Sequence, residues 1–298
     1  MKNIVITGGT GFFGMNLVEE LLERGYFLTV TVRPGSEHNQ RLPASERLTV
    51  IENDIGEIEK LPKLLENRIG GPIPEYDTFY HLAWRGGRND IEAQLENVRD
   101  SLKALETAAL LGCKRFICSG SQAEYGVTEG IITEEEPCCP VTAYGAAKAS
   151  ACYLTRVKAG QLGTDWIWGR IFSLIGKYEP FGRMLPDLIE KLRKGEEAHL
   201  SSCEQFWDYL DAKDAAKAFI LLGEKGRAGE IYNVAAGARR KLREYVGETA
   251  EFFNKDAAIV YGDDPKPFIS LRPSVEKLEK DTGWSPEIEF KRSLKWYT

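Results

Sequence analysis

Three glycines near the start of the chain constrain the fold most. In TGGTGFFG (residues 7–14) they recur at every third position, directly after the apolar run KNIVIT and directly before the amphipathic run FFGMNLVEELLERG. Glycine there permits a tight turn and a close backbone approach to a pyrophosphate, and the helix N-terminus offers amide donors to phosphate oxygens. The motif predicts a strand–turn–helix unit that binds a dinucleotide. The expected contacts are Gly8, Thr10, Gly11, Phe12, Phe13 and Gly14.

Short apolar runs and helical patterns alternate along the N-terminal part of the chain. The apolar runs have the length and the β-branched and aromatic content of buried strands, and the segments between them carry apolar residues at three- and four-residue steps. This alternation predicts an α/β fold, a Rossmann-type doubly wound parallel sheet with helices on both faces. The expected strands are residues 2–7, 27–32, 48–53, 78–83, 115–120 and 165–172, and the expected helices are 12–25, 94–112 and 142–160.

The regular alternation loosens after about residue 173 of the 298 residues. A chain of this length accommodates one large domain or two modest ones. We expect a dinucleotide-binding Rossmann domain at residues 1–173. Residues 174–298 are expected to form mainly a smaller α/β substrate-binding lobe, with segments that return to the first domain.

The end of the second expected strand indicates which dinucleotide binds. NAD sites place an Asp or Glu near this point to hold the ribose hydroxyls, whereas NADP sites place an arginine near the 2′-phosphate. Here the sequence TVTVRPGSEHNQR has Arg33 at that point and no carboxylate before Glu37. Arg33 offers a planar set of donors, and Ser36 follows closely. The sequence therefore favours NADP over NAD.

Two stretches, SGSQAEYG (119–126) and AYGAAK (143–148), supply candidate catalytic groups. Ser121 lies at the end of the fifth expected strand, where ligands bind in open α/β sheets. Tyr144 and Lys148 are four residues apart and share one helix face. We expect the lysine cation, together with the oxidised nicotinamide, to favour the phenolate and to bring the pKa of the tyrosine down from its usual value of about 10. The three groups suit proton and hydride transfer at a carbinol or carbonyl carbon.

With these motifs, the chain resembles the extended short-chain dehydrogenases/reductases of the NAD-dependent epimerase/dehydratase family, which act largely on nucleotide-activated sugars. The resemblance runs along essentially the whole chain. It implies that Asp54 and Ile55 lie against the adenine and that HLAW (81–84), through Leu82, Ala83 and Trp84, passes the cofactor with its backbone. It also implies that Asn97 contacts the cofactor and that Ser121, Tyr144 and Lys148 are catalytic. Family members often form homodimers through two helices, so a homodimer is expected.

Departures from the family pattern narrow the reaction. The 4,6-dehydratases carry Thr-Asp-Glu at the serine position, whereas Ser121 is followed here by Gln122 and Ala123. Without that acidic pair, a dehydratase is not expected. The segments SGSQAEYG and QFWDYL resemble 4-ketosugar reductases of the CDP-abequose synthase type.

The expected substrate contacts also come from the resemblance. Ser173 replaces the asparagine of the family's RxFN motif, and Trp207 replaces an arginine that helps to grip the pyrophosphate in 4-epimerases. Arg272 matches the family's other phosphate arginine, and Met184 begins a region expected near the base. The expected substrate-binding residues are Gln122, Ser173, Met184, Trp207 and Arg272.

Composition excludes several other classes of protein. A net charge of −6 argues against non-specific nucleic-acid binding. No apolar run has membrane-spanning length, and the start of the chain lacks a signal-peptide pattern. The six cysteines have no metal-ligand spacing, so no metal site and a reduced, cytoplasmic setting are expected.

Three hypotheses for the function remain open at this point. The first is NADP-dependent reduction of a nucleotide-linked 4-keto deoxyhexose. The second is a nucleotide-sugar 4-epimerase with tightly bound NAD. The third is a non-catalytic protein that senses NADP, and the presence of Ser121, Tyr144 and Lys148 argues against it.

Overall fold

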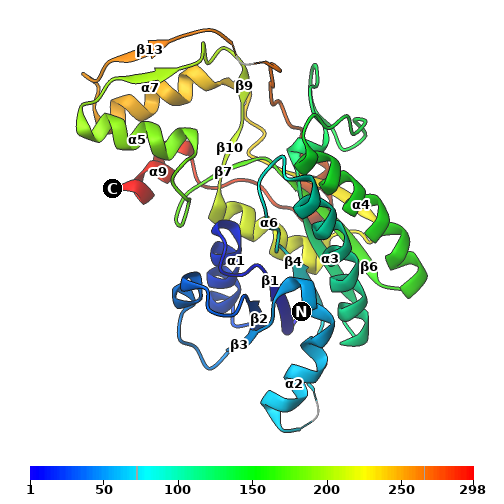
Figure 1. Ribbon diagram of the computed structural model, residues 1–298. Helices are drawn as coiled ribbons and strands as arrows, with labels where there is room; N and C mark the ends of the chain where they lie inside the picture. Colours follow the sequence, from blue (N-terminus) through cyan, green and yellow to red (C-terminus); the bar gives the residue numbers. More distant parts are fainter. Residues whose placement is uncertain (72, 265) are drawn as a thin grey trace.

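A computed structural model of the chain describes residues 1–71, 73–264 and 266–298. Its centre is a seven-stranded sheet in the order β11-β6-β5-β4-β1-β2-β3, in which every neighbouring pair is parallel (Figure 1). This is the doubly wound α/β sheet that the sequence predicts. The strands are β1 (Asn3–Thr7), β2 (Phe27–Val32), β3 (Leu48–Glu52), β4 (Thr78–His81), β5 (Arg115–Ser121), β6 (Asp165–Ile171) and β11 (Glu230–Val234).

Helices cover both faces of this sheet, because side chains of one strand alternate between the faces. On β1, Ile4 and Ile6 join a core with helices α1 (Phe12–Glu23) and α6 (Ala212–Lys225). Val5 points to the other core, which includes side chains of α3 (Ile91–Leu110) and α4 (Ala143–Leu162). A shorter helix, α2 (Leu61–Ile69), also contributes to this second core.

A second, smaller group of elements lies above the sheet and has its own core (Figure 1). Helix α5 (Met184–Lys194) packs on α7 (Leu242–Phe253) in this group. Three short strand pairs accompany them: β7 (Ser173–Ile175) with β10 (Tyr209–Asp211), β8 (Ala198–Leu200) with β13 (Ile259–Tyr261), and β9 (Phe206–Trp207) with β12 (Arg240–Lys241).

Several segments beyond residue 173 pack on the main sheet rather than in the upper group. Strand β11 is the last strand of that sheet, and α6 packs on α1. Helix α8 (Glu276–Thr282) packs on both β11 and α6, while α9 (Phe290–Ser293) returns to α7 and β10. The chain therefore crosses between the two groups more than once, and these crossings place the cleft between them.

The boundaries of all three expected helices differ from the structure, by up to three residues, and α1 ends at Glu23 rather than at residue 25. Helix α3 begins at Ile91 rather than at residue 94, because the Asp90 side chain accepts a hydrogen bond from Ala93 N and caps it (3.2 Å). Helix α4 continues past Gly160 to Leu162 and ends at Gly163, which has a left-handed backbone (φ 66°). Within the described residues, no helix combines the length and the apolar character needed to span a bilayer.

Candidate active site

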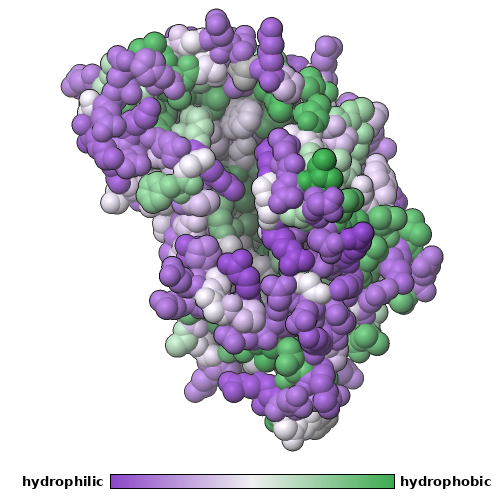
Figure 2. All heavy atoms as spheres, viewed as in Figure 1, coloured by the Kyte–Doolittle hydropathy of each residue, from purple (hydrophilic) through white to green (hydrophobic). Residues whose placement is uncertain are grey.

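A cavity of about 680 Å³ opens at the carboxyl ends of the main-sheet strands. It is lined by the glycine turn, by residues that follow β4, β5 and β6, by α4, and by the start of α5 and the strand β9. Figure 2 shows the molecule hollowed between the upper group and the body. Carboxyl ends of parallel strands are the usual ligand site of such folds.

The glycine turn has the shape that the sequence predicts, and two of its glycines are required by packing. Gly8 has a positive φ of 74°, and a Cβ atom there would lie 2.5 Å from Ala83 N. A Cβ on Gly14 would lie 2.1 Å from Gly8 O. Any other residue at these two positions would force the turn apart. A Cβ atom on the third glycine, Gly11, would meet no protein atom nearer than 3.4 Å.

Gly11 is exposed to the cavity, and this openness is what a dinucleotide phosphate requires. It is the N-cap of α1 and supplies no side-chain cap, so the first amides of the helix have no side-chain acceptor. Phe12 and Phe13 line the cavity beside it, while Thr10 lies half-buried in the turn. The residues present therefore fit a pyrophosphate at the start of α1.

The proposed cofactor-discriminating residues lie outside the cavity lining, at the end of β2. Arg33 is exposed and Ser36 is half-buried. The Arg33 carbonyl accepts hydrogen bonds from Ser36 N (3.3 Å) and Asn39 Nδ2 (3.0 Å), which fixes the loop. Among the described residues, no carboxylate pairs with the Arg33 guanidinium, so its donors face solvent where a 2′-phosphate is expected.

Asp54 and Asn97 are held by a network around Arg85. Asp54 caps the turn at Ile55 by accepting from Gly56 N and pairs with Arg85 (3.2 Å). Arg85 also pairs with Asp100, which is 3% exposed, at 2.7 Å. The Asn97 side chain forms two hydrogen bonds with the Arg85 backbone: Oδ1 accepts from Arg85 N (3.0 Å) and Nδ2 donates to Arg85 O (2.8 Å). Asn97 thus positions the loop after β4 instead of presenting its amide to a ligand.

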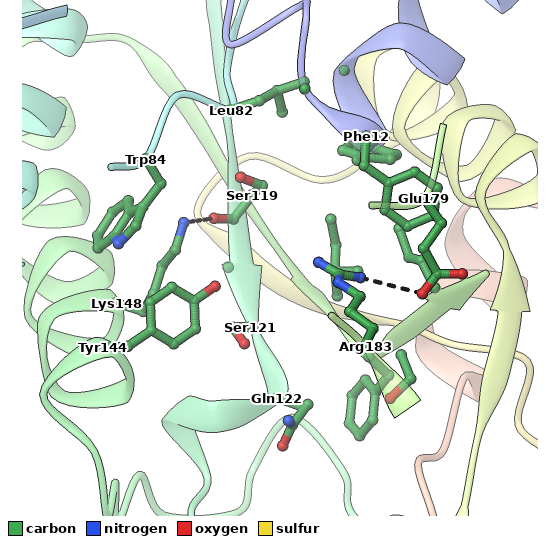
Figure 3. Close-up of a pocket in the computed structure, with 18 of the residues that line it drawn as sticks. Phe12, Leu82, Trp84, Ser119, Ser121, Gln122, Tyr144, Lys148, Glu179 and Arg183 are labelled. Carbon is green, nitrogen blue, oxygen red and sulfur yellow. Dashed lines mark hydrogen bonds and ion pairs between the residues drawn. The ribbon is translucent and has the colours of Figure 1, made fainter. Parts of the chain in front are cut away.

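The three candidate catalytic residues meet in the cavity (Figure 3). Ser121 ends β5, and Tyr144 and Lys148 come from the first turns of α4. Helix α4 starts where the Thr142 side chain accepts from Gly145 N (3.1 Å), which fixes the height of both side chains above the sheet. Ser121 Oγ accepts from Ala123 N (3.2 Å), so its own proton is left for a ligand.

Lys148 is buried, and its ammonium has two neighbours. Nζ donates to Ser119 O (2.7 Å) and lies 3.7 Å from the ring centre of Trp84. Burial lowers the pKa of Lys148 to about 8. The indole of Trp84, a cofactor contact by resemblance, is itself fixed by a hydrogen bond to Gln94 Oε1 (2.8 Å). Leu82 completes this wall of the cavity.

In the protein without a nicotinamide, burial is the main influence on the pKa of Tyr144, and the expected joint effect of Lys148 and the oxidised nicotinamide stays a prediction. Burial raises the pKa of Tyr144, because desolvation penalises the phenolate. Ser121, Arg88 and Arg183 oppose this shift, and Lys148 is not one of the main influences, since its Nζ is directed at Ser119 and Trp84. Tyr144 is therefore held as the protonated phenol, the form that donates a proton.

A buried ion pair behind Ser121 is a feature that sequence reasoning missed. Glu124 accepts from Ser121 N (2.7 Å) and from Trp168 Nε1 (3.0 Å). It pairs with Arg170 at 2.7 Å, and the two side chains are 0% and 1% exposed. The Arg170 guanidinium also lies over the Tyr125 ring, 4.4 Å from its centre. Glu124 thereby fixes the backbone of Ser121, and both of its oxygens are used in these contacts.

A second missed pair forms the wall opposite Tyr144 (Figure 3). Arg183 precedes α5, and its guanidinium lies 3.7 Å from Glu179 and 5.4 Å from the ring centre of Phe12. The Glu179 side chain is 3% exposed and accepts a hydrogen bond from the hydroxyl of Tyr297. The spacing of Glu179 and Arg183, four residues apart, was the only sequence signal for this pair.

The structure brings four of the five expected substrate residues to the cavity. Gln122, Ser173, Met184 and Trp207 line it. Arg272 is not among the lining residues: its guanidinium stacks on Phe206, 4.9 Å from the ring centre. The side chain expected to hold phosphates thus lies against Phe206, outside the cavity lining.

Comparison with known proteins agrees with this geometry. A sequence model of the NAD dependent epimerase/dehydratase family matches residues 4–235. A UDP-glucose 4-epimerase of Corynebacterium glutamicum is 26% identical over 307 residues, which cover 95% of this chain and 91% of that protein. A GDP-6-deoxy-D-mannose reductase of Pseudomonas aeruginosa is 26% identical over 310 residues, 99% of this chain and 95% of that protein.

Solved structures agree on the fold. A UDP-N-acetylglucosamine 4-epimerase from Methanobrevibacter ruminantium, in complex with UDP-N-acetylmuramic acid, superposes with a TM-score of 0.86 at 24% identity, covering 99% of this chain and 98% of that chain. The Pseudomonas aeruginosa RMD structure, complexed with NADPH, has a TM-score of 0.80 at 22% identity and covers 100% of this chain and 98% of that chain.

Proposed function

The chain belongs to the NAD-dependent epimerase/dehydratase family, and we propose that it reduces the 4-keto group of a nucleotide-linked deoxyhexose with NADPH. The observation that carries the direction of the reaction is the exposed Arg33 at the end of β2, where NAD sites place an acidic residue. A preference for NADP(H), the pool that cells keep reduced, favours net reduction. The buried phenol of Tyr144 holds the proton that reduction must deliver. Relatives that include a GDP-6-deoxy-D-mannose reductase and a dTDP-6-deoxy-L-talose 4-dehydrogenase support a deoxyhexose substrate.

In this proposal, each catalytic side chain acts on the carbonyl oxygen or on the group beside it. A reduced nicotinamide in the site supplies a hydride to the carbonyl carbon. Tyr144 donates its phenolic proton to the carbonyl oxygen, and Ser121 Oγ donates a hydrogen bond to the same oxygen. The guanidinium of Arg88 lies 5.6 Å and the ammonium of Lys148 5.9 Å from the ring centre of Tyr144. Both cations stabilise the phenolate that remains until solvent reprotonates it.

Dehydration does not fit the side chains beside Ser121. Gln122 lines the cavity but carries no acidic proton, and Ala123 is buried. The nearby carboxylate of Glu124 is enclosed by Arg170 and by the backbone of Ser121. None of these groups can exchange a proton with the substrate, so we assign no dehydratase activity.

Three further assignments belong to the proposal. NADP as the cofactor rests on Arg33, with Ser36 beside it. The proposed homodimer rests on apolar side chains that α3 and α4 leave exposed, among them Leu95, Leu110, Leu154 and Val157. The proposed cytoplasmic setting rests on the six cysteines, which have no metal-ligand spacing. The mass of a single chain in light scattering would contradict the dimer.

The cofactor assignment is tested by Arg33→Ala. The wild-type protein is expected to bind NADPH more tightly than NADH, and the variant to lose about 10- to 100-fold in NADPH affinity, because a charged hydrogen bond to the 2′-phosphate is removed. NADH affinity is expected to stay unchanged. Fluorescence titration of both nucleotides measures this, with Arg68→Ala, at an exposed position of α2, as the control. Equal loss for NADH and NADPH would reject the assignment.

A further inference from the structure

A diphosphate bound in the cavity would require a basic side chain, and neither arginine position of the family pattern provides one there. Trp207 lines the cavity where the resemblance places a phosphate-binding arginine, and Arg272 lies outside the lining. Among the described residues, the basic side chains that line the cavity are Arg88, Lys148 and Arg183. Lys148 is buried between Ser119 and Trp84, so it is not available to a diphosphate.

Arg183 has the geometry of an available cation. Its side chain is 51% exposed, and its contact with Glu179, at 3.7 Å, is longer than a hydrogen bond. In Figure 3 the guanidinium projects from the far wall toward the space between Glu179 and the catalytic residues. It also lies over Phe12, at the start of α1. Most of its donors are therefore unused in the free protein.

Glu179, in contrast, is held in place. Tyr297 donates to its carboxylate and accepts from Gly176 N (3.0 Å). The next residue of the loop, Lys177, pairs with Glu19 of α1 (2.8 Å), and its carbonyl accepts from Asn16 Nδ2 (3.0 Å). The loop after β7 is thus anchored to α1 and to the C-terminal segment, and Arg183 is the exposed partner of the pair.

We infer that Arg183 binds the diphosphate of the nucleotide sugar, in place of an arginine at position 207, and that Glu179 holds Arg183 while the cleft is empty. This inference rests on the proposed function, since it assumes a nucleotide-linked substrate. A guanidinium matches two phosphate oxygens with parallel donors. A diphosphate competes well for Arg183 because the existing contact with Glu179 is long.

When the Arg183 guanidinium moves from Glu179 to the diphosphate, the pKa of Glu179 is expected to change. The groups that face this carboxylate are Arg183 on its own loop, Tyr297 from the C-terminal segment and Tyr209 from β10. Burial raises the pKa of Glu179 to about 7, and Arg183 opposes that shift. When the cation leaves, the pKa rises further, so the carboxyl group takes up a proton. Diphosphate binding is therefore expected to weaken as the pH rises above 7.

The test uses calorimetry on the full chain with UDP, CDP, dTDP and GDP, and with the matching nucleosides. Arg183→Ala is expected to weaken binding of the preferred diphosphate by about 10- to 100-fold, while its nucleoside and NADPH bind as before. Arg183→Lys is expected to keep part of the affinity. Arg193→Ala, on the exposed last turn of the same helix, is the matched control and is expected to bind like the wild type. Melting curves establish that each variant is folded.

Proton uptake is measured at pH 8, where the diphosphate is fully ionised, in two buffers of different ionisation enthalpy. The wild type is expected to show a buffer-dependent binding enthalpy, and Glu179→Gln to lose that dependence. Wild-type diphosphate affinity in Arg183→Ala overturns the inference but leaves the proposed function standing. A loss of NADPH binding instead assigns Arg183 to the cofactor and also overturns it. If the wild type binds none of the four diphosphates, the proposed function itself is rejected.

Discussion

Tyr144→Phe is expected to lower turnover by about 10²- to 10⁴-fold, the range typical for loss of a general acid. The substitution removes only the phenolic oxygen, so the ring keeps its edge contact with Trp84, and the affinity for NADPH is expected to stay within about twofold. Oxidation of NADPH in the presence of nucleotide-linked 4-keto deoxyhexoses measures the change.

Tyr153→Phe is the matched control for this prediction. Tyr153 lies on the same helix, is 50% exposed, and makes only a long contact to Cys138 Sγ (3.7 Å) among the described residues. Its variant should turn over like the wild type. Near-full turnover by Tyr144→Phe would show that another group delivers the proton, and the assigned site would be wrong.

Glu124→Ala is expected to destabilise the folded protein by about 3–5 kcal/mol, because removing one partner of a buried ion pair leaves the other charge uncompensated. Arg170 would be that charge, and Ser121 N and Trp168 Nε1 would lose their acceptor. Denaturant unfolding, followed by circular dichroism, measures the free energy of unfolding.

Two further variants separate this effect from a general loss of contacts. Glu106→Ala breaks an exposed ion pair with Lys158 (2.6 Å) and is expected to cost no more than about 1 kcal/mol. Replacing both Glu124 and Arg170 by leucine leaves no charge unpaired, so it should regain part of the loss. A Glu124→Ala variant as stable as Glu106→Ala would contradict the assigned burial of charge.

The parts of the fold that the sequence predicts are those set by local pattern. Strands such as FLTVTV carry only apolar and β-branched residues because both faces of a parallel sheet are covered, and this composition can be recognised from the strand's own sequence. The glycine turn is equally local, since Gly8 and Gly14 are required within a few residues of each other. Ser121, Tyr144 and Lys148 could be placed together because one short motif ends β5 and the other begins α4, the next long helix.

The parts that could not be predicted depend on residues far apart in the chain. Glu124 and Arg170 look like surface charges until β5 and β6 pair and bury them together. Glu179 is made a buried carboxylate by Tyr297, more than a hundred residues away. The direction of Lys148 toward Trp84 and Ser119 could not be predicted either, because Trp84 follows β4 and Ser119 lies on β5.

Net reduction is the central claim, and the nicotinamide content of freshly purified protein tests it most directly. A reductase exchanges its cofactor every cycle, whereas a 4-epimerase recovers its hydride and gains from keeping NAD bound. The protein is denatured, and the released nucleotide is identified by mass and counted against protein. We predict that the purified protein carries little nicotinamide or carries NADP(H), and that the protein freed of nucleotide binds NADPH more tightly than NADH. One NAD per chain, retained through purification, would contradict reduction and assign the protein as a 4-epimerase.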